Sequence, residues 1–339
     1  MLTDTHTVVL LLVLATSIAA VVGAGSSLAR TGDELAERTG LGRVFVGSLL
    51  LAVATSLPEL GIDLTAAVAD APDLAIGDLF GSSMANMAIL GIIDLRYRRR
   101  VLPTVELGHT RIAAIGIGLT ALAVMGLGTS PGASVAGVGV TPIVITVGYL
   151  AALAWFRRVP PLGVAEPTPT PFRQPPRASG RWEGTRPVLR RFAAAAVVLG
   201  LAAPALALGT QELAARSGLS EGFLGVALLA TASSLPELVA SLAAVRMGAH
   251  DLAVGNLFGS NAANMAMIVF IDAAYRPGPI LAAVDRAHFV AGTGAILLMA
   301  LALASILSGQ VNRARRLEPD SLILLVAYVG AVVAVGLAA

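Results

Sequence analysis

The sequence contains no cysteine and no lysine, and only 13% of its 339 residues are charged. The absence of cysteine excludes disulfides, thiolate nucleophiles and cysteine-ligated metals. So little charge, with 56% hydrophobic residues and a mean hydropathy of +0.82, cannot cover the surface of a soluble protein of this length. Aromatic residues make up 4%, the net charge is +2, and no basic tract is interleaved with aromatics, so nucleic-acid binding is not expected. The composition therefore indicates a polytopic membrane protein.

Long apolar runs predict the membrane-spanning segments, because a helix needs about 20 such residues to cross the hydrocarbon. Ten candidate spans follow, at residues 7–28, 41–69, 73–95, 109–128, 136–156, 192–214, 222–247, 251–271, 286–308 and 320–338. The predicted fold class is therefore an all-α polytopic membrane protein with ten transmembrane helices.

The arginines are distributed unevenly between the two sides of this topology. Loops 1–2, 3–4, 5–6, 7–8 and 9–10 share one side and hold 20 of the 23 arginines. By the positive-inside rule that side is cytoplasmic. Both termini are then expected on the external side of the cell membrane. The proline- and arginine-rich residues 158–190 are expected to form an extended cytoplasmic linker between the halves 1–157 and 191–339.

The chain contains an internal repeat. Residues 40–98 align with residues 218–276 at a constant offset of 178, and 32 of the 59 positions are identical. Each half holds five predicted spans, and an odd number inverts the second copy in the membrane. Two inverted five-helix repeats of this kind place a substrate site near the midplane, where the repeats meet.

Proline occurs in the middle of spans 2 and 7, as Pro58 and Pro236. Proline removes a backbone donor, and a serine followed three residues later by glutamate is a helix-start pattern. Span 2 is therefore predicted to end near residue 54 and restart at 56, and span 7 to break between 232 and 234. Spans 3 and 8 are predicted to be broken as well. The breaks would free carbonyls at 52–55 and 230–233.

Each repeat also places one glutamate, Glu59 or Glu237, at the centre of the bilayer. A charge there costs about 2.5–3.5 kcal/mol on insertion scales. A shared divalent cation would neutralise both, and Ca²⁺ takes roughly six to eight oxygen ligands. The alternative, two protonated helix caps, does not account for a break in mid-membrane. Asn86 and Asn264 fall level with the glutamates and offer uncharged oxygens, so the site would match one Ca²⁺ or two Na⁺.

Other polar positions repeat at helical spacing. In each of two sets, three polar residues follow one another at a spacing of four and so share one helix face. The sets are Asp78, Ser82 and Asn86, and Asn256, Ser260 and Asn264. Hydrogen bonding between helices is the alternative reading for the two serines. Asp63 is expected to line an access path or hold a proton, and a water-facing residue of a vestibule is an equal alternative. Asp94 and Asp272 are expected to be interfacial anchors. The four histidines lie singly near span ends, which does not indicate a zinc site.

At these residues the sequence resembles the sodium/calcium exchangers of the cation/Ca²⁺ antiporter superfamily. Members carry two inverted alpha repeats, each with a G-T-S-[LV]-P-[ED] and a G-N-x-x-G-S-x-x-x-[ND] motif. Here the first motif is ATSLPE and ASSLPE, and the second is GDLFGSSMAN and GNLFGSNAAN. Ala54 and Ala232 replace glycine, Ser233 replaces threonine and Asp78 replaces asparagine.

The resemblance implies a shared Ca²⁺ and Na⁺ site. Glu59 and Glu237 look like its central ligands, and Thr55 and Ser233 resemble residues that give backbone oxygens to Ca²⁺. The remaining implied ligands, at flanking Na⁺ sites and at the midplane, are Ser56, Ser82, Ser234, Ser260, the carbonyls of Ala52 and Ala230, and the amides of Asn86 and Asn264.

The expected function is secondary antiport, in which Ca²⁺ leaves the cytoplasm as Na⁺ enters. The alternative is Ca²⁺/H⁺ antiport with the same glutamates taking up protons on the return step. A channel is disfavoured, because one chain supplies both halves of the site. An enzyme is not expected, since no nucleophile–base pair is evident. The expected partners are the transported ions and the lipid bilayer, with no resident cofactor and a monomeric transport unit.

Overall fold

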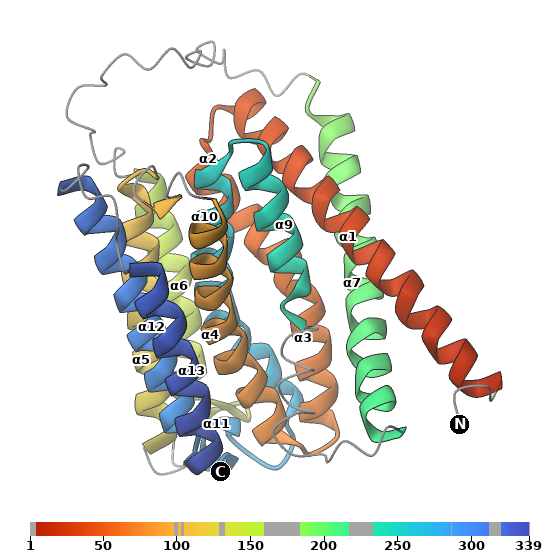
Figure 1. The fold of residues 1–339 in the computed structure, drawn as a ribbon. Helices are drawn as coiled ribbons and strands as arrows, with labels where there is room; N and C mark the ends of the chain where they lie inside the picture. Colours follow the sequence, from red (N-terminus) through yellow and green to blue (C-terminus); the bar gives the residue numbers. More distant parts are fainter. Residues whose placement is uncertain are drawn as a thin grey trace.

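A computed structural model describes residues 5–97, 101–102, 105–128, 133–158, 184–216, 233–285, 287–311 and 320–338. These residues form a bundle of long helices (Figure 1). The elements are α1 (Thr5–Thr39), α2 (Arg43–Phe45), the π-helix η1 (Val46–Leu51), α3 (Ala52–Val68), α4 (Pro72–Arg96), α5 (Gly108–Gly128), β1 (Ser134–Val135), β2 (Val138–Gly139), α6 (Val140–Arg158), α7 (Arg186–Arg216), α9 (Leu235–Arg246), α10 (His250–Ala274), α11 (Ile280–Ala283), α12 (Ala287–Val311) and α13 (Asp320–Ala338).

The bundle has the length and polarity of a membrane domain. In the part of the chain that the structure describes, eight helical segments are long and apolar enough to cross a bilayer, and Val140–Phe156 is a shorter apolar helix. Large apolar side chains point outward from the peripheral helices, such as Leu201, 72% exposed, and Leu337, 84% exposed. Such surfaces are stable only against lipid. The chain is therefore a polytopic helical membrane protein, as predicted; of the predicted span 222–247, the structure describes residues 233–247.

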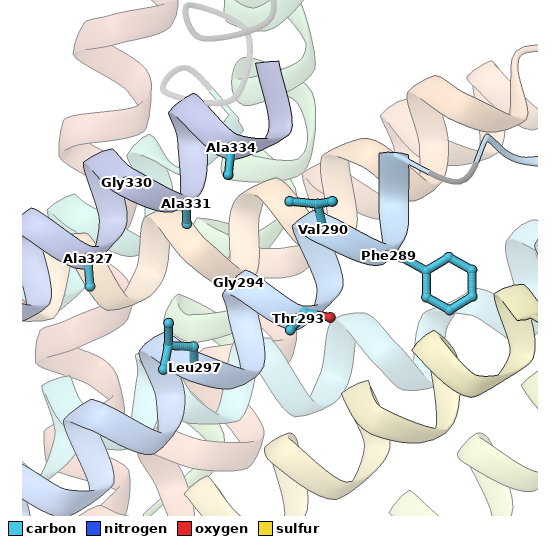
Figure 2. A pocket seen from close by; sticks show the side chains of 9 residues that line it. All are labelled: Phe289, Val290, Thr293, Gly294, Leu297, Ala327, Gly330, Ala331 and Ala334. Carbon is cyan, nitrogen blue, oxygen red and sulfur yellow. The ribbon is translucent and has the colours of Figure 1, made fainter. Parts of the chain in front are cut away.

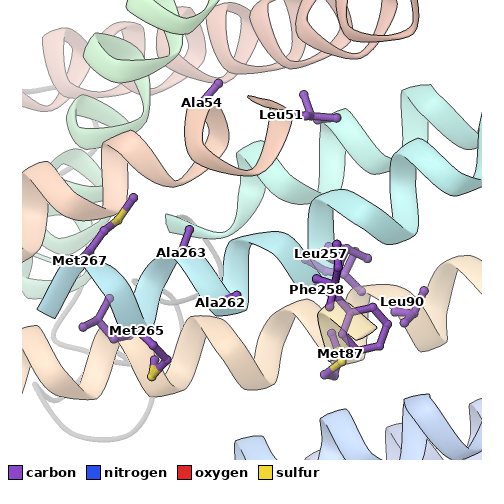
Figure 3. Close-up of a cluster of buried hydrophobic side chains, with 14 of the residues drawn as sticks. Leu51, Ala54, Met87, Leu90, Leu257, Phe258, Ala262, Ala263, Met265 and Met267 are labelled. Atoms are coloured by element: carbon purple, nitrogen blue, oxygen red, sulfur yellow. The ribbon is translucent and has the colours of Figure 1, made fainter. Parts of the chain in front are cut away.

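The helices are arranged around α4 and α10 (Figure 1). Helices α3 and α9 lie beside this central pair, α1 and α7 pack against each other on one flank, and α5, α6, α12 and α13 form the other flank. The two chain ends lie at the same end of the bundle. Buried apolar residues of the centre, including Met87 and Leu90 of α4 and Leu257 and Phe258 of α10, are drawn in Figure 3.

The predicted break in span 2 is wrong. Helix α3 runs without interruption through Pro58, and the irregular part is the six-residue π-helix η1 that precedes it. Proline is tolerated inside membrane helices because neighbouring helices and hydroxyl side chains satisfy the freed backbone groups. At the junction of η1 and α3, before the proline, the Ala52 carbonyl accepts the hydroxyls of Thr55 and Ser260.

The predicted breaks in spans 3 and 8 are also wrong, since α4 and α10 are each continuous over 25 residues. In span 7 the helix α9 begins at Leu235 after Ser234, with Pro236 in its first turn, where its missing N–H is not needed. Ser234 makes no side-chain capping bond, so the predicted capping box does not form there. A short hairpin also replaces the predicted start of span 5: β1 and β2 pair antiparallel around Ala136 and Gly137, which both have positive φ.

Glycines allow η1 and α10 to approach at backbone distance. A Cβ added to Gly259 would lie 2.3 Å from the Ser48 carbonyl oxygen, and one added to Gly47 would lie 2.6 Å from the Leu252 carbonyl oxygen. Gly255 and Gly259, which form a G-x-x-x-G pair in α10, thus allow close helix packing. The repeat equivalent of Gly259 in α4 behaves differently, because a Cβ at Gly81 would meet nothing within 4 Å.

The aspartates expected at the interface are instead buried acceptors of backbone hydrogen bonds. Asp272 accepts the N–H groups of Gly139 and Ile280, both at 2.5 Å. Its repeat partner Asp94 accepts the N–H of Leu102 at 3.0 Å and the hydroxyl of Ser321. Each carboxylate therefore fastens the loop that leaves its helix.

Two histidine–aspartate contacts link the two repeats, one at the start of α10 and one at the start of α4. His109 Nε2 lies 3.0 Å from Asp251 Oδ1 in the first turn of α10, and His288 Nε2 lies 3.0 Å from Asp73 Oδ1 in the first turn of α4. Each aspartate also accepts the backbone N–H of the residue three positions before the histidine, at 2.7 Å. The start of α4 is thereby tied to α12, and the start of α10 to α5.

Gly259→Ala is expected to destabilise the fold, whereas the repeat-equivalent Gly81→Ala is expected to be tolerated. The new methyl group at 259 would collide with the backbone of Ser48, and overpacking of this kind costs about 1–3 kcal/mol. Thermal unfolding of the two variants in detergent measures the difference. Equal melting temperatures would contradict the close contact between α10 and η1.

Asp272→Ala is expected to lower stability, because it leaves the buried N–H groups of Gly139 and Ile280 without an acceptor. Hydrogen bonds to a charged group contribute about 1.5–3 kcal/mol each. Asp272→Asn keeps an acceptor for only one of these N–H groups and sets its NH2 group against the other, so it is expected to lose only part of the stability. A melting temperature for Asp272→Ala equal to that of the wild type would show that these bonds do not hold the loop.

Candidate cation site

The predicted ligand residues converge in the middle of the bundle. Eleven of the twelve lie in the described part of the chain, on α3, α4, α10 and the start of α9, and all are at most 2% exposed. The twelfth, Ala230, lies outside the described residues. Among the described residues, no three His, Asp or Glu side chains form a metal-binding cluster. Any cation here would therefore be bound by two carboxylates together with neutral oxygens.

The two glutamates stand at the centre of this group. Glu59 Oε2 accepts the amide of Asn264 at 3.0 Å, across the two repeats. The carboxylates of Glu59 and Glu237 lie close enough for the charge of one to act on the other. Three of their four oxygens, Glu59 Oε1 and both oxygens of Glu237, have no hydrogen-bond partner. The two carboxylates therefore lie near each other in the buried interior of the bundle.

The two asparagines are oriented by acceptors on the opposite repeat. Asn86 donates its amide to Asn261 Oδ1 at 2.9 Å, and Asn261 in turn donates to the Ser83 carbonyl at 3.2 Å. Asn264 donates to Glu59, as above. Both amide groups are thus committed as donors, which leaves Asn86 Oδ1 and Asn264 Oδ1 without a donor.

Sequence reasoning missed Asn261. It differs from its repeat partner Ser83, so a search for matching polar residues passed over it. Its position directly after Ser260 in the second glycine-containing motif was the available signal. It orients Asn86 and does not itself present a free oxygen.

The hydroxyl residues meet across the repeats. Thr55 Oγ1 donates to the Ala52 carbonyl at 3.1 Å and lies 3.4 Å from Ser260 Oγ, which also donates to that carbonyl at 3.4 Å. On the other side, Ser234 Oγ lies 3.5 Å from Ser82 Oγ. The structure therefore places these predicted residues in two clusters, one around Thr55 and Ser260 and one around Ser82 and Ser234.

Two further serines complete the arrangement. Ser56 lies near the Glu237 carboxylate, although its Oγ has no hydrogen-bond partner. Ser233 donates to Asp78 Oδ1 at 3.2 Å, so this hydroxyl is engaged by an aspartate outside the predicted ligand set.

The chemistry of the unpartnered atoms is uniform. Six buried oxygens from the predicted residues lack a hydrogen-bond partner: Ser56 Oγ, Glu59 Oε1, Asn86 Oδ1, Glu237 Oε1 and Oε2, and Asn264 Oδ1. Buried polar groups are normally satisfied, and oxygens with no donor nearby are the ligands that hard cations take. Because the site has two carboxylates, it is suited to bound cations whose total charge is +2.

A separate groove lies between α12 and α13 (Figure 2). Its volume is about 580 Å³, and it is lined mainly by apolar residues such as Val290, Leu297 and Ala331, with Thr293 as a hydroxyl. None of the predicted ligands lines it. A groove with so few polar groups is not suited to bind an ion.

Comparison with known proteins agrees with this geometry. The family model described as "Sodium/calcium exchanger protein" matches residues 9–156 and 189–337. The putative antiporter CaxA of Alkalimonas amylolytica is 29% identical over 312 residues, 88% of this chain and 89% of that protein. The inner membrane protein YrbG of Escherichia coli K12 is 27% identical over 244 residues, 71% of this chain and 72% of that one.

A solved structure has the same fold. The sodium-calcium exchanger NCX_Mj, soaked with 10 mM Na⁺ and no Ca²⁺, superposes with a TM-score of 0.70 at 18% identity, over 96% of this chain and 98% of that one. The family model covers most of both halves of the present chain. The chain therefore belongs to the sodium/calcium exchanger family and is a cation/Ca²⁺ antiporter, not an enzyme.

Proposed function

We propose that this protein exchanges Ca²⁺ for Na⁺ by alternating access to one central site built around Glu59 and Glu237. The observation that carries the proposal is the set of six buried oxygens without partners, three of which belong to two neighbouring carboxylates. One Ca²⁺ or two Na⁺ would each neutralise the two charges, so both ions can compete for the same groups. The similarity to NCX_Mj, a sodium-calcium exchanger, supports Na⁺ as the coupling ion.

The proposed architecture has ten spans in two inverted repeats, 1–157 and 191–339, with the alpha motifs at 40–98 and 218–276. The two separate matches of the family model, at 9–156 and 189–337, support this division. The mirrored contacts His109–Asp251 and His288–Asp73 support an inverted relation between the halves. In this topology both termini are external, the linker 158–190 is cytoplasmic, and one chain in the cell membrane forms a complete transport unit.

Coupling follows from the cost of the uncompensated charges. Two carboxylates in an apolar interior repel each other and lose their hydration, whereas a bound cation offsets both effects. The protein therefore changes its access side readily when loaded and reluctantly when unloaded. This restriction converts two binding reactions at one site into exchange.

The moving part in this proposal is the pair α1 and α7, which pack side by side (Figure 1). Leu14 of α1 fits against Gly209 of α7, and Arg191 pairs with Glu34 at 2.8 Å, so the two helices are joined to each other. Against the core, Gly25 of α1 meets the side chain of Val239 on α9. Such a smooth apolar contact allows the pair to slide over the site.

Glu59→Gln and Glu237→Gln are expected to reduce Ca²⁺ uptake to near the background of protein-free vesicles. Each removes one of two charges that balance the ion. The assay is ⁴⁵Ca²⁺ uptake into Na⁺-loaded proteoliposomes diluted into Na⁺-free medium. Glu37→Gln, which changes a carboxylate that is 56% exposed on the surface, is the matched control and is expected to transport normally.

The same vesicles distinguish the coupling ion. When choline replaces Na⁺ and a pH gradient is kept, Na⁺/Ca²⁺ exchange predicts loss of uptake. Uptake driven equally well by the pH gradient alone would replace the proposal with Ca²⁺/H⁺ antiport. Undiminished exchange by Glu59→Gln would contradict the ligand assignment itself.

Asn261→Ala is expected to weaken Ca²⁺ transport without abolishing it. The change removes the acceptor that orients the amide of Asn86, and loss of such a supporting contact lowers metal affinity by about 10–100-fold. The measurement is the Ca²⁺ concentration at half-maximal uptake. An unchanged concentration would show that Asn86 does not depend on this contact.

A further inference from the structure

Two chains of three polar residues lie at equivalent positions beside the central site, and each chain takes residues from both repeats. In one, Thr55 Oγ1, which also lies near the Ala52 carbonyl, is 3.2 Å from Asn256 Oδ1, Asn256 Nδ2 donates to Ser241 Oγ at 3.1 Å, and Ser241 donates to the Ala253 carbonyl at 3.4 Å. Each of these side-chain atoms has a partner, and no member is charged. This chain is complete without any ion.

The other chain occupies the same positions at the offset of 178 and consists of Ser233, Asp78 and Asp63. Ser233 donates to Asp78 Oδ1 at 3.2 Å, which reproduces the contact between Thr55 and Asn256. The carboxyl groups of Asp78 and Asp63 lie within reach of each other, where the opposite repeat has an amide and a hydroxyl. Two carboxyl groups, which can only accept hydrogen bonds when both are ionised, thus replace a donor and its acceptor.

The acidic pair is buried and receives little compensation from the residues that the structure describes. Asp63 is 0% exposed and Asp78 is 7% exposed. No N–H or hydroxyl group of the described residues donates a hydrogen bond to either oxygen of Asp63 or to Oδ2 of Asp78, and the two carboxyl groups can bond to each other only if one of them carries a proton. Among the residues that the structure describes, no arginine or histidine forms an ion pair with either carboxylate. Asp63, which was expected to line an access path, has no exposed surface in this conformation.

We propose that Asp63, Asp78 and the Ser233 hydroxyl form a second subsite for a hard cation, Na⁺ or Ca²⁺, next to the central site. The choice of ions rests on the proposed function. Asp63 lies one helical turn beyond Glu59 on α3, so a cation at the subsite is one step from the central carboxylates. The acidic pair exists in one repeat alone, and it therefore makes the two halves of the transporter unequal in charge.

The test uses Asp63→Ser combined with Asp78→Asn in the full-length protein. These changes install the residues of the complete neutral chain, whose geometry already exists in the other repeat. Saturating equilibrium binding of ⁴⁵Ca²⁺ and of ²²Na⁺, measured separately on purified protein, is expected to fall by about one ion per chain for the ion that occupies the subsite. Binding that depends on Glu59 and Glu237 is expected to remain, and Glu37→Gln is the control.

The reciprocal variant, Ser241→Asp with Asn256→Asp, places an acidic pair in the second repeat and is expected to bind about one ion more. It decides the question if the first variant does not fold. Unchanged stoichiometry for both ions in the folded variant overturns the subsite. Failure of the wild type to transport Ca²⁺ would refute the proposed function alone, because the binding measurement does not require transport.

Discussion

The structure depends on holding two carboxylates side by side in an interior that water does not reach. Glu59 and Glu237 are both fully buried, and three of their four oxygens have no donor from the protein. Such a pair persists only where a cation or protons offset the repulsion, because buried like charges are strongly unfavourable. The converging helices, the neutral oxygens around the pair and the closed packing of α4 and α10 all serve this requirement.

The duplication explains how one chain surrounds such a pair. Each repeat contributes one glutamate, one midplane asparagine and a set of hydroxyls, and each ties its helix starts to the other repeat through an aspartate and a histidine. The symmetry is incomplete where it concerns charge and packing. Gly259 packs against the backbone of η1, whereas Gly81 has open space, and the acidic chain has no counterpart in the second repeat.

Much of the architecture could be predicted because membrane helices are long and apolar. The span predicted at 73–95 is α4 at Pro72–Arg96, and the last span, 320–338, coincides with α13. The predicted breaks in spans 2, 3 and 8 failed for a common reason. A proline weakens a helix only if its surroundings leave the freed backbone groups unsatisfied, and α3, α4 and α10 are all continuous in the packed bundle.

The amino-acid sequence by itself determined that the chain spans a membrane, that it is duplicated, and which carboxylates and amides gather in the buried middle of the bundle. These features follow from composition and spacing along single helices. Only the tertiary structure decided which oxygens remain free, since that depends on partners from the other repeat. Asn261 orients Asn86, Glu59 orients Asn264, and the carboxylates of Asp63 and Asp78 meet because α3 and α4 pack together.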